Sequence, residues 1–182
     1  MSSCDDSDEG NGFVLSLQPF YTEADLDCDQ GLVGSWTDKE GDVTFSFEQG
    51  KGPDYRLVVQ ERNDGEESSA EFEAHLVRLG PSSFVDLLPD SAVGRNEFHQ
   101  MHLFRAHSIA RIELSQDTMH MAFFNGAWLQ KKIEDKSIGV SFQRVDGTLL
   151  LTGTTKEAQD LVYLHTNDDD AFSETIALTK QE

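Results

Sequence analysis

The stretch LVGSWTDKEGDVTFSFEQGKGPDYRLVVQERNDGEESSAEFEAHLVRLGPSSFVDLL, residues 32–88, decides the predicted fold. Apolar and polar side chains alternate in segments of it, at 43–48, 54–59 and 70–77. Successive side chains of a strand point to opposite faces. Each segment therefore predicts a strand with an apolar face on a core and a polar face in water.

Tight-turn residues separate these segments. They are KEGD at 39–42, GKGP at 50–53, NDG at 63–65 and GPSS at 80–83. Gly, Asn and Asp adopt the backbone conformations that hairpin turns need, and Pro presets one of them. Short strands joined by such turns predict an up-and-down antiparallel sheet that curls or closes on itself.

The second half of the chain adds strands and two helices. Alternation continues at 108–114 and 119–123, and helical periodicity follows at 127–136. A capping box formed by Thr154 and Glu157 predicts the start of a second helix, because the two side chains satisfy amide groups of its first turn.

A hairpin and a last strand complete the predicted fold. Asp146-Gly147 is a strong two-residue hairpin signal between the two helices, and alternation returns at 172–178. We predict a mainly β, α+β fold: a curled antiparallel meander or barrel with two short helices in the C-terminal half. Residues 13–182 are expected to form one domain.

Composition limits the partners that the chain can have. Its 182 residues include 34 acidic and 14 basic side chains, giving a formal net charge of -20. This charge disfavours nucleic acid and anionic membrane surfaces, which would both repel the protein. The sequence has no apolar run long enough to span a membrane and no signal-peptide core. We expect a cytoplasmic protein or a mature exported one.

The N-terminal residues favour the exported alternative. Residues 1–12 are polar and acidic and are predicted to form a disordered tether. Ser2-Ser3-Cys4 resembles the end of a bacterial lipobox, which implies a lipid anchor on Cys4 and a place in the cell envelope, facing the periplasm or the exterior. The alternative is that Cys4 has no such role and the protein is cytoplasmic. Cys28 is expected to be a buried free thiol.

Gly34-Ser35-Trp36 resembles the Gly-x-Trp signature of lipocalins and other calycin-type barrels. The resemblance implies that Trp36 plugs the closed end of an antiparallel barrel. It also implies an arginine stacked on that ring, for which Arg144 is the candidate. Residues 17–21, 70–76 and 149–155 resemble a group of uncharacterised bacterial lipoproteins, which implies no activity.

The inward faces of the predicted strands carry bulky apolar residues. Aromatic rings at most of these positions favour a filled interior over an open cavity, although methionines suit an adaptable apolar pocket. The candidate ligand-binding residues are Trp36, Phe45, Phe47, Tyr55, Phe72, Phe84, Met119, Met121 and Phe123.

Catalytic and cofactor motifs are not found in the sequence. It contains no phosphate loop, dinucleotide glycine pattern, nucleophile elbow, Cys-x-x-Cys or His-Glu-x-x-His, so we expect neither an enzyme nor a cofactor. His99, His102, His107 and His120 are the one concentration of metal-ligand side chains. They could share a metal ion. The alternative interpretation is ordinary surface or hydrogen-bonded histidines.

These observations leave three functional hypotheses. The first is an envelope-associated binding or accessory protein that takes a small apolar ligand inside a β-barrel. The second is a protein-interaction module without a ligand, which uses the irregular segment 90–100 or a sheet edge. The third, with the least support, is a histidine-based metal-binding protein or enzyme.

Overall fold

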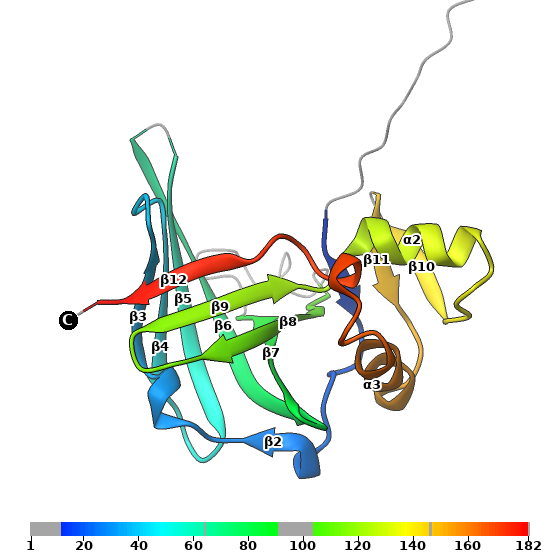
Figure 1. Cartoon of the computed structure of the whole chain (residues 1–182), viewed down its shortest axis with the longest axis horizontal. Coiled ribbons are helices and arrows are strands. Elements are labelled where there is room, and N and C mark those ends of the chain that lie inside the picture. Colours follow the sequence, from blue (N-terminus) through cyan, green and yellow to red (C-terminus); the bar gives the residue numbers. More distant parts are fainter. Residues whose placement is uncertain (1–11, 64, 91–103, 146, 182) are drawn as a thin grey trace, which may run out of the picture.

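The computed structural model describes residues 12–63, 65–90, 104–145 and 147–181. Its main feature is a closed barrel of eight antiparallel strands (Figure 1). Each strand pairs with the next, and the last pairs back with the first. In chain order the strands are β3 (Gly34–Asp38), β4 (Val43–Gln49), β5 (Asp54–Asn63), β6 (Glu66–Leu79), β7 (Ser82–Pro89), β8 (His107–Leu114), β9 (Thr118–Phe123) and β12 (Ile176–Lys180).

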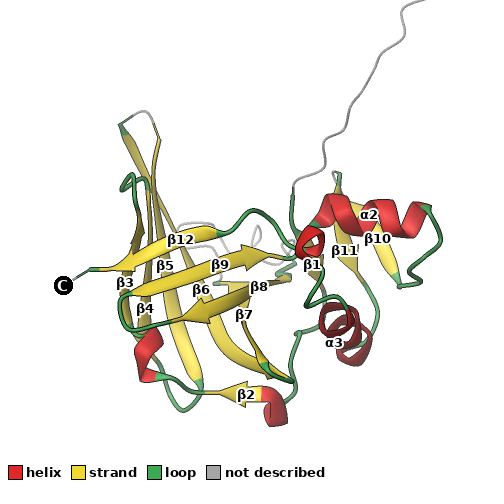
Figure 2. Ribbon diagram, in the orientation of Figure 1, coloured by secondary structure: helices red, strands yellow, loops and turns green. Residues whose placement is uncertain are grey.

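An insertion separates the last two barrel strands and lies on one side of the barrel (Figure 2). It consists of α2 (Gly126–Glu134), β10 (Phe142–Val145), β11 (Thr148–Leu151), α3 (Thr155–Leu164) and the short 3-10 helix η3 (Asp169–Ala171). β1 (Val14–Ser16) joins the insertion to the barrel, because it pairs in parallel with β11 and antiparallel with β8. The same sheet therefore continues from the barrel into the insertion.

The remaining elements lie before the first barrel strand. They are η1 (Glu23–Asp25), β2 (Leu26–Asp27), which pairs with β6, and η2 (Gln30–Leu32).

Local sequence signals account for both helices. The side chain of Asn125 accepts hydrogen bonds from the amides of Ala127 and Trp128 at 3.0 and 3.2 Å, so it caps the start of α2. The predicted capping box holds the start of α3, where the Thr154 amide donates to Glu157 at 2.7 Å and the Glu157 amide donates to the Thr154 hydroxyl at 3.3 Å. The two predicted helices are confirmed.

Buried apolar residues form two clusters. One fills the barrel from Trp36 and Phe47 to Met119 and Met121, and we call it the barrel core. The other, the outer core, lies between the outer face of the barrel and the insertion. Phe84 belongs to the outer core, where it packs near Phe172, so the prediction that it lines the barrel interior is wrong. Residues 84–87 of β7 are all buried, and alternation cannot identify the inner face of such a strand.

The closed end of the barrel is built on Trp36. Its indole nitrogen donates to the carbonyl of Leu32 at 2.9 Å, and the Nζ atom of Lys180 lies 5.0 Å from its ring centroid. Lys180 also donates to the carbonyl of Gly31 at 3.0 Å. The cation on the tryptophan is thus Lys180. Arg144 lies on β10 and pairs with Glu134, so its predicted stacking on Trp36 is wrong.

Two further features concern the surface. Cys28 is exposed, so the prediction of a buried thiol is wrong; its Sγ atom lies 3.7 Å from the Tyr55 hydroxyl. It occupies the short segment between β2 and η2, which lies over the end of the barrel instead of inside a core. Within the described ranges, no helix combines the length and apolar character needed to cross a membrane.

Candidate functional site: a cavity at the barrel mouth

The end of the barrel opposite Trp36 opens into a cavity of about 440 Å³. Its lining is mainly apolar and comes from the inner faces of the barrel strands and from the residues around β1. The lining residues are Phe13, Leu15, Val43, Phe45, Val59, Glu61, Ser68, Ser69, Ala70, Phe72, Leu87, Pro89, Ala106, Ser108, Phe123 and Ile176.

The inner row of β5 shows how the barrel changes from filled to open. Tyr55 and Leu57 are 2% and 0% exposed and belong to the barrel core. Val59, the next residue on this face, is half-buried, and Glu61 after it is exposed. Both line the cavity. The β5–β6 hairpin extends beyond the neighbouring strands (Figure 1), so this row forms a wall above a packed floor.

The candidate ligand-binding residues divide by depth. Phe45, Phe72 and Phe123 line the cavity. Trp36, Phe47, Tyr55, Met119 and Met121 lie deeper, in the barrel core, where each is at most 2% exposed. The expected filled interior is therefore present at the closed end, while the mouth is open. Phe13 completes the cavity from outside the barrel, and its ring centroid lies 4.8 Å from that of Phe123.

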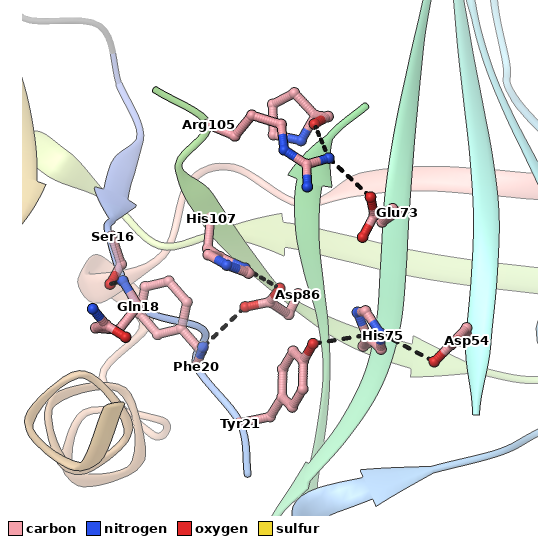
Figure 3. A network of polar contacts seen from close by, with 11 residues as sticks. Ser16, Gln18, Phe20, Tyr21, Asp54, Glu73, His75, Asp86, Arg105 and His107 are labelled. Atoms are coloured by element: carbon pink, nitrogen blue, oxygen red, sulfur yellow. Dashed lines mark hydrogen bonds and ion pairs between the residues drawn. The ribbon is translucent and has the colours of Figure 1, made fainter. Parts of the chain in front are cut away.

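A row of polar side chains crosses the outer face of the barrel (Figure 3). Asp54, His75 and Asp86 are direct cross-strand partners on β5, β6 and β7, and His107 follows on β8. His75 Nε2 lies 3.2 Å from the Asp54 carboxylate, and His107 Nδ1 lies 2.7 Å from that of Asp86. We call these four residues the polar row.

The N-terminal segment covers the polar row. The amide of Phe20 donates to Asp86 at 3.0 Å, and the Tyr21 ring lies on His75 with a centroid separation of 4.6 Å. Burial, followed by the charges of Asp86, Asp54 and Glu73, raises the pKa of Tyr21 to about 12. Asp86 is fully buried, and the His107 tautomer with its proton on Nδ1 completes the hydrogen bond to an ionised Asp86 carboxylate.

The polar row holds the N-terminal segment on the barrel through contacts with Phe20 and Tyr21. Ser16 pairs with His107 between strands, but its hydroxyl accepts a hydrogen bond from the Gln18 amide at 3.2 Å. Among the described residues, no hydrogen bond joins Ser16 to His107. The Nδ1 atom of His75 is buried without a partner.

The predicted histidine metal site is only partly within the described chain. His107 is buried against Asp86, whereas His120 is exposed on β9 opposite Glu113. Glu113 lies six residues from His107 along β8, which places the two histidines about 20 Å apart. The other two, His99 and His102, lie outside the described residues, as does Cys4. Among the residues that are described, no three His, Cys, Asp or Glu side chains are grouped to hold a metal ion.

The features that the sequence interpretation missed are Glu61, the polar row and the contribution of Phe13. Glu61 continues the alternation of Tyr55, Leu57 and Val59, so extending the predicted strand by two residues would have placed it at the mouth. Asp86, inside an otherwise apolar strand, was the sequence signal for a buried polar contact.

Comparison with known proteins adds no family or named relative. No protein-family model, curated protein or solved structure matches the chain.

Proposed function

We propose that this chain is a non-enzymatic binding protein that holds a small, largely apolar molecule in the cavity at the barrel mouth. The observation that carries the proposal is an apolar cavity of about 440 Å³ above a packed barrel floor. Location at the bacterial cell envelope, with an anchor on Cys4, is part of the same proposal and concerns residues outside those described.

Size and lining both support a small-molecule ligand. Ligand sites in proteins usually measure about 300–1,000 Å³ and combine apolar walls with a few polar groups. At about 30 Å³ for each non-hydrogen atom, taking the share of a water molecule in the liquid, the cavity accepts roughly 15 such atoms. A ligand of this size is expected to bind in the micromolar range.

A protein-interaction module is the second candidate. β10 is the outer strand of the sheet and carries the exposed side chain of Val145, so its free edge could accept a strand from a partner. This edge spans only Phe142–Val145 and carries Arg144, and short charged edges usually resist such pairing. The cavity therefore has the stronger support.

The test uses a variant that fills the cavity. Ala70 lies on the inner face of β6 and lines the mouth, so Ala70→Phe places a ring inside. Ala177 is exposed on β12 and pairs with His120, whose neighbours Met119 and Met121 point inward. Ala177→Phe is therefore the matched control on the outer face. Binding of the neutral probe N-phenyl-1-naphthylamine is measured by its fluorescence enhancement.

We expect the unmodified protein and Ala177→Phe to bind the probe with the same dissociation constant, and Ala70→Phe to bind at least about tenfold more weakly. A tenfold loss corresponds to about 1.4 kcal/mol, which is less than the usual value of burying one apolar side chain. Equal binding by all three proteins, or binding by none, would refute the proposal.

A further inference from the structure

Glu61 is the only charged residue among the described residues that line the cavity. It pairs across the sheet with Val43 and with Ser68, which line the cavity beside it. Its carboxylate is therefore at the rim of a site whose other described lining residues are uncharged and mainly apolar. Among the described residues it has neither a hydrogen bond nor an ion pair.

The acidic residues on the outer face of the same hairpin are paired. Arg56 contacts Glu48 at 3.0 Å and Glu71 at 2.9 Å, and Arg62 contacts Glu67 at 2.8 Å. These arginines follow the outer row of β5, so they pair with carboxylates of the outer face. Among the described residues, Glu61 on the inner row has no such cation. The lack of a pairing cation is thus specific to the face that lines the cavity.

From this arrangement we infer that the cavity selects amphiphiles with a cationic head group, which Glu61 receives at the rim while the apolar tail occupies the cavity. The inference rests on the proposed function and adds the chemical class of the ligand. A carboxylate within about 4–6 Å favours a cation and disfavours an anion. The formal net charge of -20 acts in the same direction over a longer range.

The apolar part of the site sets the length of the tail. Phe45 and Leu87 are 5% and 2% exposed and lie at the base of the cavity, whereas Glu61 is at its rim. A chain that reaches from this base to the rim buries its carbons and leaves its head group beside the carboxylate. Dodecyltrimethylammonium, with about 16 non-hydrogen atoms, matches the estimated capacity of the cavity.

The test compares three ligands that share one tail. Dodecyltrimethylammonium, dodecanol and dodecanoate displace N-phenyl-1-naphthylamine, each below its micellar concentration. We expect the cation to bind about fivefold more tightly than the alcohol, the equivalent of about 1 kcal/mol for an exposed charge pair. The anion is expected to bind most weakly.

Two variants with the same change in charge separate the effect of the rim carboxylate on ligand preference from the effect of the net charge. Glu61→Gln removes the carboxylate at the cavity, and Glu67→Gln removes one from the outer face of the same hairpin. We expect Glu61→Gln to bind the cation and the alcohol within about twofold of one another, and Glu67→Gln to keep the fivefold preference. Affinity for dodecanol should be the same in all three proteins.

The outcomes distinguish this inference from the function on which it rests. Binding of the neutral probe and dodecanol without a preference for the cation would overturn the inference and leave the proposed function intact. A preference that Glu61→Gln and Glu67→Gln reduce equally would also overturn it, because the net charge would then be its cause. Failure to bind any neutral probe would refute the proposed function itself.

Discussion

Replacing Asp86 tests whether the polar row holds the N-terminal segment on the barrel. Asp86 is 0% exposed and accepts hydrogen bonds from the Phe20 amide and from His107. Asp86→Ala leaves both donors buried without their acceptor. Hydrogen bonds to a charged group contribute about 1.5–3 kcal/mol each, and removing one partner of a buried pair costs about 3–5 kcal/mol. We expect Asp86→Ala to lower the free energy of unfolding by about 3–5 kcal/mol.

Asp86→Asn separates hydrogen bonding from charge. Its side-chain oxygen can accept from the Phe20 amide, while its amide group donates to His107 once that ring moves its proton to Nε2. Both hydrogen bonds then persist without the charge, and we expect a loss of about 1–2 kcal/mol. Glu73→Gln is the control, because it breaks the exposed pair of Glu73 with Arg105 at a cost below about 1 kcal/mol.

Denaturant unfolding measures these differences, and amide hydrogen exchange at Phe20 measures the local effect. For a chain of this size, 3–5 kcal/mol corresponds to a fall in Tm of roughly 6–20 °C. Asp86→Ala should also remove the exchange protection of the Phe20 amide. The reasoning is refuted if Asp86→Ala unfolds within about 1 kcal/mol of the unmodified protein, or if the Phe20 amide keeps its full protection.

Two further predictions concern the closed end and alkaline pH. Lys180→Met should lower the free energy of unfolding by about 1–2 kcal/mol, because it removes the cation over Trp36 and the hydrogen bond to Gly31 while keeping an apolar stem. Unfolding monitored by tryptophan fluorescence measures this loss, with Arg144→Met as the control. An equal loss in Arg144→Met would contradict the role of Lys180. Burial raises the pKa of Tyr21 from 10.0 to about 12, so the folded state keeps a proton that the unfolded state loses, and stability should fall as pH rises from 10 to 12. Tyr21→Phe should make that decline shallower when urea midpoints are compared across this range, and an unchanged slope would show that Tyr21 does not contribute.

The parts of the fold that short-range patterns encode were predictable. The strands at residues 43–47 and 70–76 follow from alternation, and both helices begin where Asn125 and Thr154 cap them. Each depends on side chains within a few residues of one another, so the sequence contains the complete signal. The sequence also placed Trp36 inside an antiparallel barrel, and Trp36 belongs to the barrel core.

The parts that depend on contacts between distant residues were not predictable in the same way. Phe84 and Asp86 both face outward on a strand that is buried on both sides. The insertion packs on Phe84, and the N-terminal segment covers Asp86, so their burial depends on distant parts of the chain. Lys180 reaches Trp36 because the last strand closes the barrel, which the sequence pattern of β12 does not reveal. The sequence left a filled interior and an open cavity as alternatives, and it could not show that both occur, because the bulky residues are concentrated toward one end of the barrel.

The position of β1 has a consequence for the order of folding. This strand is synthesised before the barrel strands, but its partners are β8 and β11, which lie far along the chain. A nascent chain that has completed β3 to β7 therefore has no place for β1 and leaves the apolar outer side of β7 uncovered. Because contacts between distant parts of a chain form slowly, this strand is expected to dock late. Its docking brings Phe20 and Tyr21 over the polar row and seals the side of the barrel that was built before it.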